Sequence, residues 1–345
     1  MRLTRRDMLR RAALHGAGAA LAIVLARSAV PSRARAADLA SGTIAIPRGR
    51  EIVLVAADGS GERTIVTSPA GEFIADVSLS PDRSLVAFGR FNAPPGGGPG
   101  GADVMLVPTD GSGPPRMVAE RDGRGTLLAA PYFLPDGRGI LFEVIGVTAN
   151  GLPTVRADVV GIDGSGRRTF AEDGRFPTVA ADGRTAAYVK SQMTGDSVWI
   201  RPADGGPDRQ IISDRDLLIV SFPRFSPDGS RMIVAGVGHL ERFVQKLSAG
   251  DKGDIAARDV IPPLAERITA VAAHGLPVDP WLVGVDGAGL QRLALLSIDD
   301  AAVAWSPDGR WVAVAGADGV RLLSPEDGRV VQVSEGSSFG AIDWR

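Results

Sequence analysis

A short turn motif recurs along this chain of 345 residues and limits the folds open to it. Each copy places Ser-Pro-Asp-Gly, or a close variant, between two apolar segments. Pro presets φ, Asp bonds back to nearby backbone and Gly adopts positive φ, so each copy predicts a tight turn between two strands. The five copies are Leu79-Ser80-Pro81-Asp82-Arg83, Leu134-Pro135-Asp136-Gly137, Ala180-Ala181-Asp182-Gly183, Ser226-Pro227-Asp228-Gly229 and Ser306-Pro307-Asp308-Gly309.

A second turn alternates with the first and consists of Asp-Gly between two apolar strands, which is a strong hairpin signal. Its copies lie within residues 52–66, 104–118, 159–170, 198–212, 282–295 and 320–333. Two hairpins per repeat make a four-stranded unit of about 40–50 residues, which is typical of the blade of a β-propeller. The repeats therefore predict an all-β fold.

The end of the chain indicates how the propeller closes. Residues 340–345 match the strand that precedes the turn elsewhere, such as 302–305, whereas residues 42–67 supply three strands of a blade that lacks its first. We therefore expect a six-bladed propeller in which the C-terminal strand completes the first blade and removes the open edges.

The number of blades depends on residues 230–290. With six blades, residues 238–279 are an insertion in the fifth blade, because 275–289 repeat the pattern of 151–166. The alternative is seven blades with one degenerate, in which residues 243–247 form a strand and residues 268–273 begin the degenerate blade.

The alternation of the two turns resembles the WD-like repeats of TolB-like β-propellers, over nearly all of residues 42–345. The resemblance implies a role in protein assemblies of the cell envelope. TolB proteins carry an additional N-terminal α/β domain. Only about five residues separate the predicted cleavage site from the first strand here, so we expect a chain without that domain.

Residues 1–36 have the order of an export signal. Thr4-Arg5-Arg6-Asp7-Met8-Leu9-Arg10 resembles the twin-arginine motif, an apolar stretch of residues 12–26 follows, and Ala34-Arg35-Ala36 gives an A-x-A cleavage site. The stretch is shorter than the roughly 20 residues of a spanning helix. We predict a twin-arginine-type signal peptide over 1–36, a propeller domain over 37–345, and a periplasmic or extracellular location. Contact with a membrane is expected only if the signal stays uncleaved.

The net charge of the whole chain differs from that of the predicted propeller domain, because the predicted signal is strongly basic. Residues 1–36 hold eight Arg and one Asp, and the whole chain carries −2, so residues 37–345 carry −9. Such a domain repels nucleic acid, and we expect no nucleic-acid partner.

No pattern in the sequence predicts a catalytic centre, a metal site or a cofactor. Cys is absent and only three His occur, so thiolate chemistry is excluded and His chemistry is scarce. Residues 336–340 fit G-x-S-x-G, but a nucleophile elbow needs a following helix and a downstream His, so we interpret them as a turn before the last strand. The Gly-rich residues 94–101 lack the Lys of a phosphate loop.

The connections between the two hairpins of a blade vary in length, at residues 91–102, 145–157 and 238–279. Variation confined to one rim is typical of a recognition surface. On this basis His239, Glu241, Arg242 and His274 are the predicted binding residues. We hypothesise a non-catalytic scaffold that binds a protein, peptide or ligand in the cell envelope. The alternative is an extracytoplasmic carbohydrate-active hydrolase or lyase, since the fold alone does not decide function.

Overall fold

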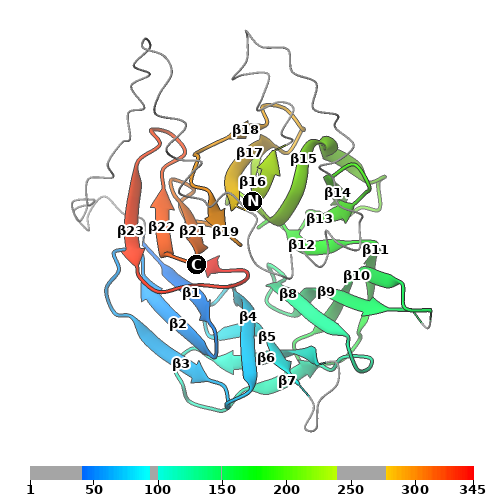
Figure 1. Ribbon diagram of the computed structural model, residues 1–345, viewed down its shortest axis with the longest axis vertical. Coiled ribbons are helices and arrows are strands. Elements are labelled where there is room, and N and C mark those ends of the chain that lie inside the picture. The colour runs from blue at the N-terminus through cyan, green and yellow to red at the C-terminus, as the bar shows by residue number, and fades with distance from the viewer. Residues whose placement is uncertain (1–40, 94–99, 149, 239–276) are drawn as a thin grey trace, which may run out of the picture. The chain divides into compact units, whose positions relative to one another are not determined.

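The computed structural model describes residues 41–93, 100–148, 150–238 and 277–345. Every regular element in these ranges is a β-strand. Accordingly, no helix capable of spanning a membrane occurs among the described residues. The strands form four sheets, as Figure 1 shows, in agreement with the all-β fold class predicted from the repeats.

The four sheets follow one another along the chain. The first has the order β24-β1-β2-β3 and comprises β24 (Asp343–Trp344), β1 (Thr43–Arg48), β2 (Glu51–Ala56) and β3 (Arg63–Thr67). The second comprises β4 (Glu72–Leu79), β5 (Leu85–Asn92), β6 (Gly101–Pro108), β7 (Arg116–Ala119), β8 (Leu127–Phe133), β9 (Gly139–Val147), β10 (Pro153–Gly161) and β11 (Arg168–Glu172). The third comprises β12 (Arg175–Val179), β13 (Thr185–Ser191), β14 (Asp196–Pro202), β15 (Arg209–Phe225), β16 (Arg231–Gly238), β17 (Pro277–Gly284), β18 (Gln291–Arg292) and β19 (Ile298–Asp299). The fourth comprises β20 (Ala302–Trp305), β21 (Val312–Gly316), β22 (Gly319–Leu323) and β23 (Val330–Ser334).

Each eight-stranded sheet contains two four-stranded antiparallel units. In the second sheet, β4–β7 and β8–β11 are joined by a single parallel pairing of Ala102 with Leu127. In the third sheet, the long strand β15 pairs with β14 through its first half and with β16 through its second half. The four-stranded module predicted from the alternating turns is therefore the recurring unit of the described chain.

The two turn classes lie at the same edge of the sheets. The Ser-Pro-Asp-Gly turns follow β4, β8, β12, β15 and β20, and the Asp-Gly turns follow β2, β6, β10, β14, β17 and β22. Within one unit they touch, since Thr109 N donates to Ser84 O at 2.9 Å. Because strands alternate in direction, the connections between β5 and β6 and between β9 and β10 lie at the opposite edge. We call the first edge the turn edge and the second the loop edge.

The two ends of the described chain pair with each other. In Figure 1 the red strand β24 lies beside the blue strand β1, with Ile44 opposite Trp344 and Ala45 opposite Asp343. Thr43 N also donates to Arg345 O at 2.7 Å. This supplies β1–β3 with the first strand that the N-terminal sequence lacks.

The strands on either side of the predicted insertion are direct neighbours. β16 and β17 pair antiparallel from Arg231–Gly284 to Gly236–Asp279. Residues 239–276 between them lie outside the described residues, as does the 243–247 strand of the seven-blade alternative.

The first strand of several units carries a β-bulge at one recurring position. Asp76, Ala130, Phe176 and Phe222 have φ of 53°, 46°, 46° and 51°, each six residues before the Asp of the following turn. A bulge leaves backbone N–H groups without a partner in the ladder. Buried N–H groups need an acceptor, and carboxylates of neighbouring units provide it. Ala130 N donates to Asp76 Oδ2 at 2.9 Å, and Phe176 N donates to Glu143 Oε2 at 3.4 Å.

These carboxylates tie neighbouring units together. Asp76 also accepts from Ala341 N at 2.6 Å, and Asp343 accepts from Leu79 N at 2.8 Å. Glu143 forms an ion pair with Arg175 at 2.7 Å in which both side chains are buried. The innermost strands are thus held by buried charge as well as by apolar packing, and this arrangement positions the pocket described next.

Candidate functional site

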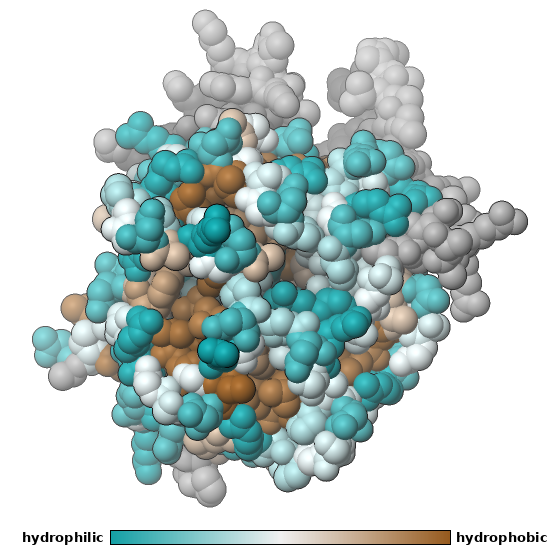
Figure 2. Space-filling model, turned by 180° about the vertical axis from the view of Figure 1, so that it is seen from behind, coloured by the Kyte–Doolittle hydropathy of each residue, from teal (hydrophilic) through white to brown (hydrophobic). Residues whose placement is uncertain are grey.

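The four residues predicted to bind a ligand, His239, Glu241, Arg242 and His274, lie outside the described residues and stay a prediction. The loop-edge connection 145–157, also predicted to take part in recognition, is described except for residue 149. It carries two exposed apolar side chains, Val147 at 63 % and Leu152 at 64 % exposure. On the face that Figure 2 shows, hydrophobic side chains lie in patches separated by hydrophilic ones.

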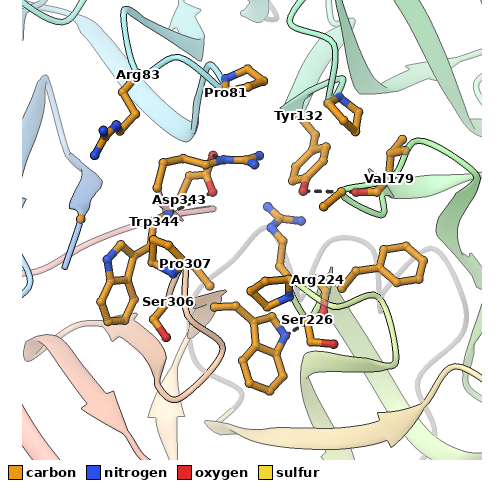
Figure 3. A pocket seen from close by; sticks show the side chains of 18 of the residues that line it. Pro81, Arg83, Tyr132, Val179, Arg224, Ser226, Ser306, Pro307, Asp343 and Trp344 are labelled. Carbon is orange, nitrogen blue, oxygen red and sulfur yellow. Dashed lines mark hydrogen bonds and ion pairs between the residues drawn. The ribbon is translucent and has the colours of Figure 1, made fainter. Parts of the chain in front are cut away.

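A cavity of about 420 Å³ opens at the turn edge, where the first strands of all the units end. The turns that follow β4, β8, β12, β15 and β20 contribute to its wall, together with the last residues of the chain. We call it the central pocket. Its lining includes Pro81, Arg83, Tyr132, Pro135, Val179, Ala181, Arg224, Phe225, Ser226, Pro227, Ala304, Trp305, Ser306, Pro307, Asp343, Trp344 and Arg345 (Figure 3).

Three polar side chains of the central pocket come from one repeat position, four residues before the turn Asp. This position holds Tyr132, Arg224 and, in the incomplete last copy, Asp343. In the other copies it holds Ser78, Thr178 and Ala304. Register confirms the equivalence, because the residues opposite on the second strand are Ala45, Ala87, Leu141, Ala187, Ile233 and Ala313. One strand position thus places six different side chains around one centre.

Arg224 is the most unusual of these side chains. It is 5 % exposed, and its Nη1 donates to the carbonyl of Pro223 at 2.9 Å. Its Nε has no hydrogen-bond partner, and no carboxylate of the described residues forms an ion pair with it. The guanidinium lies 5.0 Å from the centre of the Tyr132 ring (Figure 3). Burial lowers the pKa of Arg224 from its ordinary value, although the nearby Tyr132, Asp343 and Asp76 oppose that shift.

A second cation, Arg345, approaches the same ring. Its guanidinium carbon lies 5.7 Å from the Tyr132 centroid, and its Nε lies 3.4 Å from Asp343 Oδ2. The Asp343 carboxylate raises the pKa of Arg345. Asp343 is already engaged, because Ser78 Oγ donates to it at 3.2 Å as well as Leu79 N. Because Asp343 carries a single negative charge, it cannot neutralise both arginines.

Arg83 adds a third cation at the mouth of the central pocket. It occupies the turn position at which four other copies have Gly, and it adopts φ of 62° where those glycines have 70–71°. Left-handed backbone is costly for a residue with a Cβ. The lining therefore contains three arginines and one aspartate, and its net charge is positive.

This arrangement suits an anionic group. A buried charge without a partner is destabilising by several kcal/mol, and a carboxylate can accept two parallel N–H bonds from one guanidinium. An anion bound beside Arg224 would relieve that penalty, while Tyr132, Trp305 and Trp344 offer aromatic surface around it. The prolines of the turns give the rim a stiff backbone.

We also searched the described residues for a metal site and for a catalytic serine. No group of three His, Cys, Asp or Glu side chains among them could hold a metal ion. Residues 336–340, which fit G-x-S-x-G, connect β23 to the strand β24 and not to a helix. The strand-turn-helix context of a nucleophile elbow is therefore not formed there.

The sequence predicted binding at the loop-edge rim together with the mouth of the central channel, and it did not predict the pocket at the turn edge. A comparison of equivalent positions in the repeats could have identified this pocket. Arg224 stands on an apolar inner strand where most copies have a small or neutral residue, and Arg83 replaces a turn glycine. Both residues belong to the lining of the central pocket, where Arg224 extends into the centre and Arg83 lies exposed at the rim (Figure 3).

The modular four-stranded units around a common pocket define this protein as a β-propeller. No protein-family model matches the chain. The structure is similar to TolB from Acinetobacter baumannii, with a TM-score of 0.60, 16% identity and coverage of 92% of this chain and 68% of that one. It is also similar to a chain of a nidogen/laminin complex, with a TM-score of 0.59, 10% identity and coverage of 88% and 97%.

In sequence, the chain is 26% identical over 247 residues to the Tol-Pal system protein TolB of Anaeromyxobacter dehalogenans. The match covers 70% of this chain and 51% of the relative, so the chain spans about half the length of that protein. The protein is a TolB-like β-propeller, as its repeats predicted.

Proposed function

We propose that this protein is an exported, non-catalytic β-propeller that binds a protein or peptide partner of the cell envelope by receiving an anionic group in the central pocket. The observation that carries the proposal is Arg224, a buried guanidinium without a carboxylate partner among the described residues. A propeller built as a rigid scaffold preorganises such a cation, which reduces the entropy lost on binding.

The finer architecture belongs to the same proposal. Six blades surround the central pocket, β24 completes the first, and the insertion expected over 238–279 in the fifth is narrowed to residues 239–276, because Gly238 lies in β16 and residues 277–279 lie in β17. The β1–β24 register and the direct pairing of β16 with β17 support this interpretation.

Export is proposed from the order of residues 1–36. Residues 1–36 act as a twin-arginine-type signal, residues 37–345 form the propeller domain, and the mature protein resides in the periplasm or outside the cell. Cell fractionation with N-terminal sequencing tests this, and a mature N-terminus at Ala37 is expected. Replacing Arg5 and Arg6 together by Lys should retain the precursor in the cytoplasm. Unchanged export of this double variant would show that the route is wrong.

The binding proposal is tested by capture from envelope extract. The purified protein should retain one saturable partner, Arg224→Met should retain it at least tenfold less well, and Arg224→Lys should recover part of the loss because the charge returns. Arg116→Met serves as the control, since Arg116 lies outside the central pocket and donates to Ile162 O in an Asp-Gly turn. Equal capture by the Arg224→Met and Arg116→Met variants would refute the anionic site.

A further inference from the structure

A second cavity of about 580 Å³ lies beside the central pocket, between two units of the third sheet. Its apolar lining consists of Ile200, Pro202, Pro207, Phe225 and Val285. Phe225 is part of the lining of both cavities, so the two share a wall. We call the second cavity the side groove. It lies at the turn edge as well, since Pro207 and Val285 belong to Asp-Gly turns.

The charged residues of the side groove are already satisfied. Asp208 accepts from Arg201 Nε and Nη2, both at 2.8 Å, and from the Tyr188 hydroxyl. The hydrogen bond from Arg201 lowers the pKa of Asp208 to about 2. Arg209 Nη2 donates to the carbonyl of Val285 at 2.7 Å. The groove therefore offers apolar surface and no unpaired anion, whereas the adjoining central pocket offers cations.

We propose that the two cavities together hold the C-terminal segment of a peptide chain. The α-carboxylate lies between Arg224 and Arg345 in the central pocket, and an apolar side chain a few residues upstream fills the side groove. This inference rests on the proposed function and names its ligand. Charge complementarity fixes the orientation, because the central pocket has three arginines and one aspartate in its lining, whereas the side groove has one arginine and one aspartate and no net charge.

A chain end fits this site better than an internal acidic residue. Turns from five units, together with the last residues of the chain, surround the central pocket at the turn edge, so we expect a ligand to enter from that edge. An internal acidic residue would bring two flanking chain segments through the same opening, but a terminal carboxylate brings one. A carboxylate paired with guanidinium groups provides strong, charge-assisted hydrogen bonds. The apolar anchor in an adjoining cavity then adds affinity and selects the sequence.

The test uses randomised hexapeptides with an N-terminal fluorescent label and a free C-terminal carboxylate. The same library with a C-terminal amide is the comparison. The protein should retain the acid library at least tenfold more than the amide library, and sequencing of the retained peptides should show one upstream position enriched in apolar residues. Arg345→Met should reduce retention of the acid library at least fivefold.

Val285→Glu tests the side groove and has a matched control in Ile162→Glu. Both residues precede the Asp-Gly of an Asp-Gly turn, and the carbonyl of each accepts from an arginine at 2.7 Å, but only Val285 lines the groove. Val285→Glu should abolish the upstream apolar preference while Ile162→Glu leaves it unchanged. If both variants kept or both lost the upstream apolar preference, the proposal that the side groove binds an apolar side chain would be wrong.

The outcomes also separate this inference from the proposed function. If the amide and acid libraries bind equally, while Arg224→Met still loses the envelope partner, the anionic pocket stands and the chain-end ligand is wrong. If Arg224→Met loses neither the partner nor the peptides, both proposals fail.

Discussion

Arg83 offers a direct test of whether the central pocket was retained for binding at the expense of stability. In the turns after β8, β12, β15 and β20 the equivalent residue is Gly with φ of 70–71°, and each turn closes through the same hydrogen bond. Arg83 N likewise donates to Ser80 O at 2.8 Å, so the turn is the same and only the residue differs. We therefore predict that Arg83→Gly stabilises the fold and weakens binding of an anionic ligand.

The expected change in the free energy of unfolding follows from two opposing effects. Left-handed backbone costs a non-glycine residue about 1–2 kcal/mol, and glycine gives back about 0.5–1 kcal/mol through its greater freedom in the unfolded chain. The difference between the two effects is about 0–1.5 kcal/mol, so Arg83→Gly should raise the free energy of unfolding by about 0.75 kcal/mol at the midpoint. For a domain of this size the midpoint corresponds to a rise in Tm of about 1–2 °C.

Gly183→Arg is the mirror control. Gly183 occupies the equivalent turn, and a Cβ added there would meet no atom within 4 Å, so only the backbone effect applies. Its Tm should fall by about as much as that of Arg83→Gly rises. Thermal unfolding followed by circular dichroism measures both, and retention of the acid peptide library measures the function. A loss of stability in Arg83→Gly, or unaltered peptide retention, would refute the reasoning.

Three further predictions concern the fold. Tyr132→Phe leaves Tyr188 as the remaining tyrosine, and since burial raises its pKa to about 12, ultraviolet titration of the variant should show a phenolate midpoint far above 10 and near 12. Deleting residues 340–345 removes β24 from β1 and should severely lower Tm, whereas unaltered melting would contradict the proposed closure. Glu143→Leu leaves a buried guanidinium without its partner and should cost about 3–5 kcal/mol of unfolding free energy. Adding Arg175→Met should restore most of that loss, and a failure to do so would show that the pair is not the cause.

Much of the architecture was predictable because turn chemistry is local. The positions of Ser-Pro-Asp-Gly and Asp-Gly turns depend on what Pro, Asp and Gly do to their own backbone, and each of these turns joins two paired strands in the structure. The pairing of β24 with β1 was predictable for a similar reason, since an unmatched strand at each end of a repeat array requires a partner.

The bulges and the buried carboxylates were not predictable in the same way. Asp76, Glu143 and Asp343 are acidic residues on apolar strands, which without coordinates indicate only surface positions. Their role depends on N–H groups left unpaired by bulges in a neighbouring unit, such as that of Ala130. A contact between units far apart in sequence is not encoded in the spacing of either one.

The same distinction explains why the predicted rim and the observed pocket lie at opposite edges. Variation in loop length can be read directly from a sequence. We therefore predicted binding at the loop edge, from the unequal lengths of connections such as residues 145–157 and 238–279. The central pocket is instead built from turns of nearly constant length and from the strand ends before them, in which variation is confined to single residues such as Arg83 in a turn and Arg224 in β15. In a repeat protein every unit presents the same backbone position to the centre, so identical residues would give a symmetric and chemically uniform lining. A site that recognises one ligand in one orientation needs that symmetry broken. Here Arg83 stands where four other copies have glycine, and Arg224 stands where the other copies have a neutral residue or Asp343. We therefore expect the residues that depart from the repeat to determine which ligand the central pocket binds.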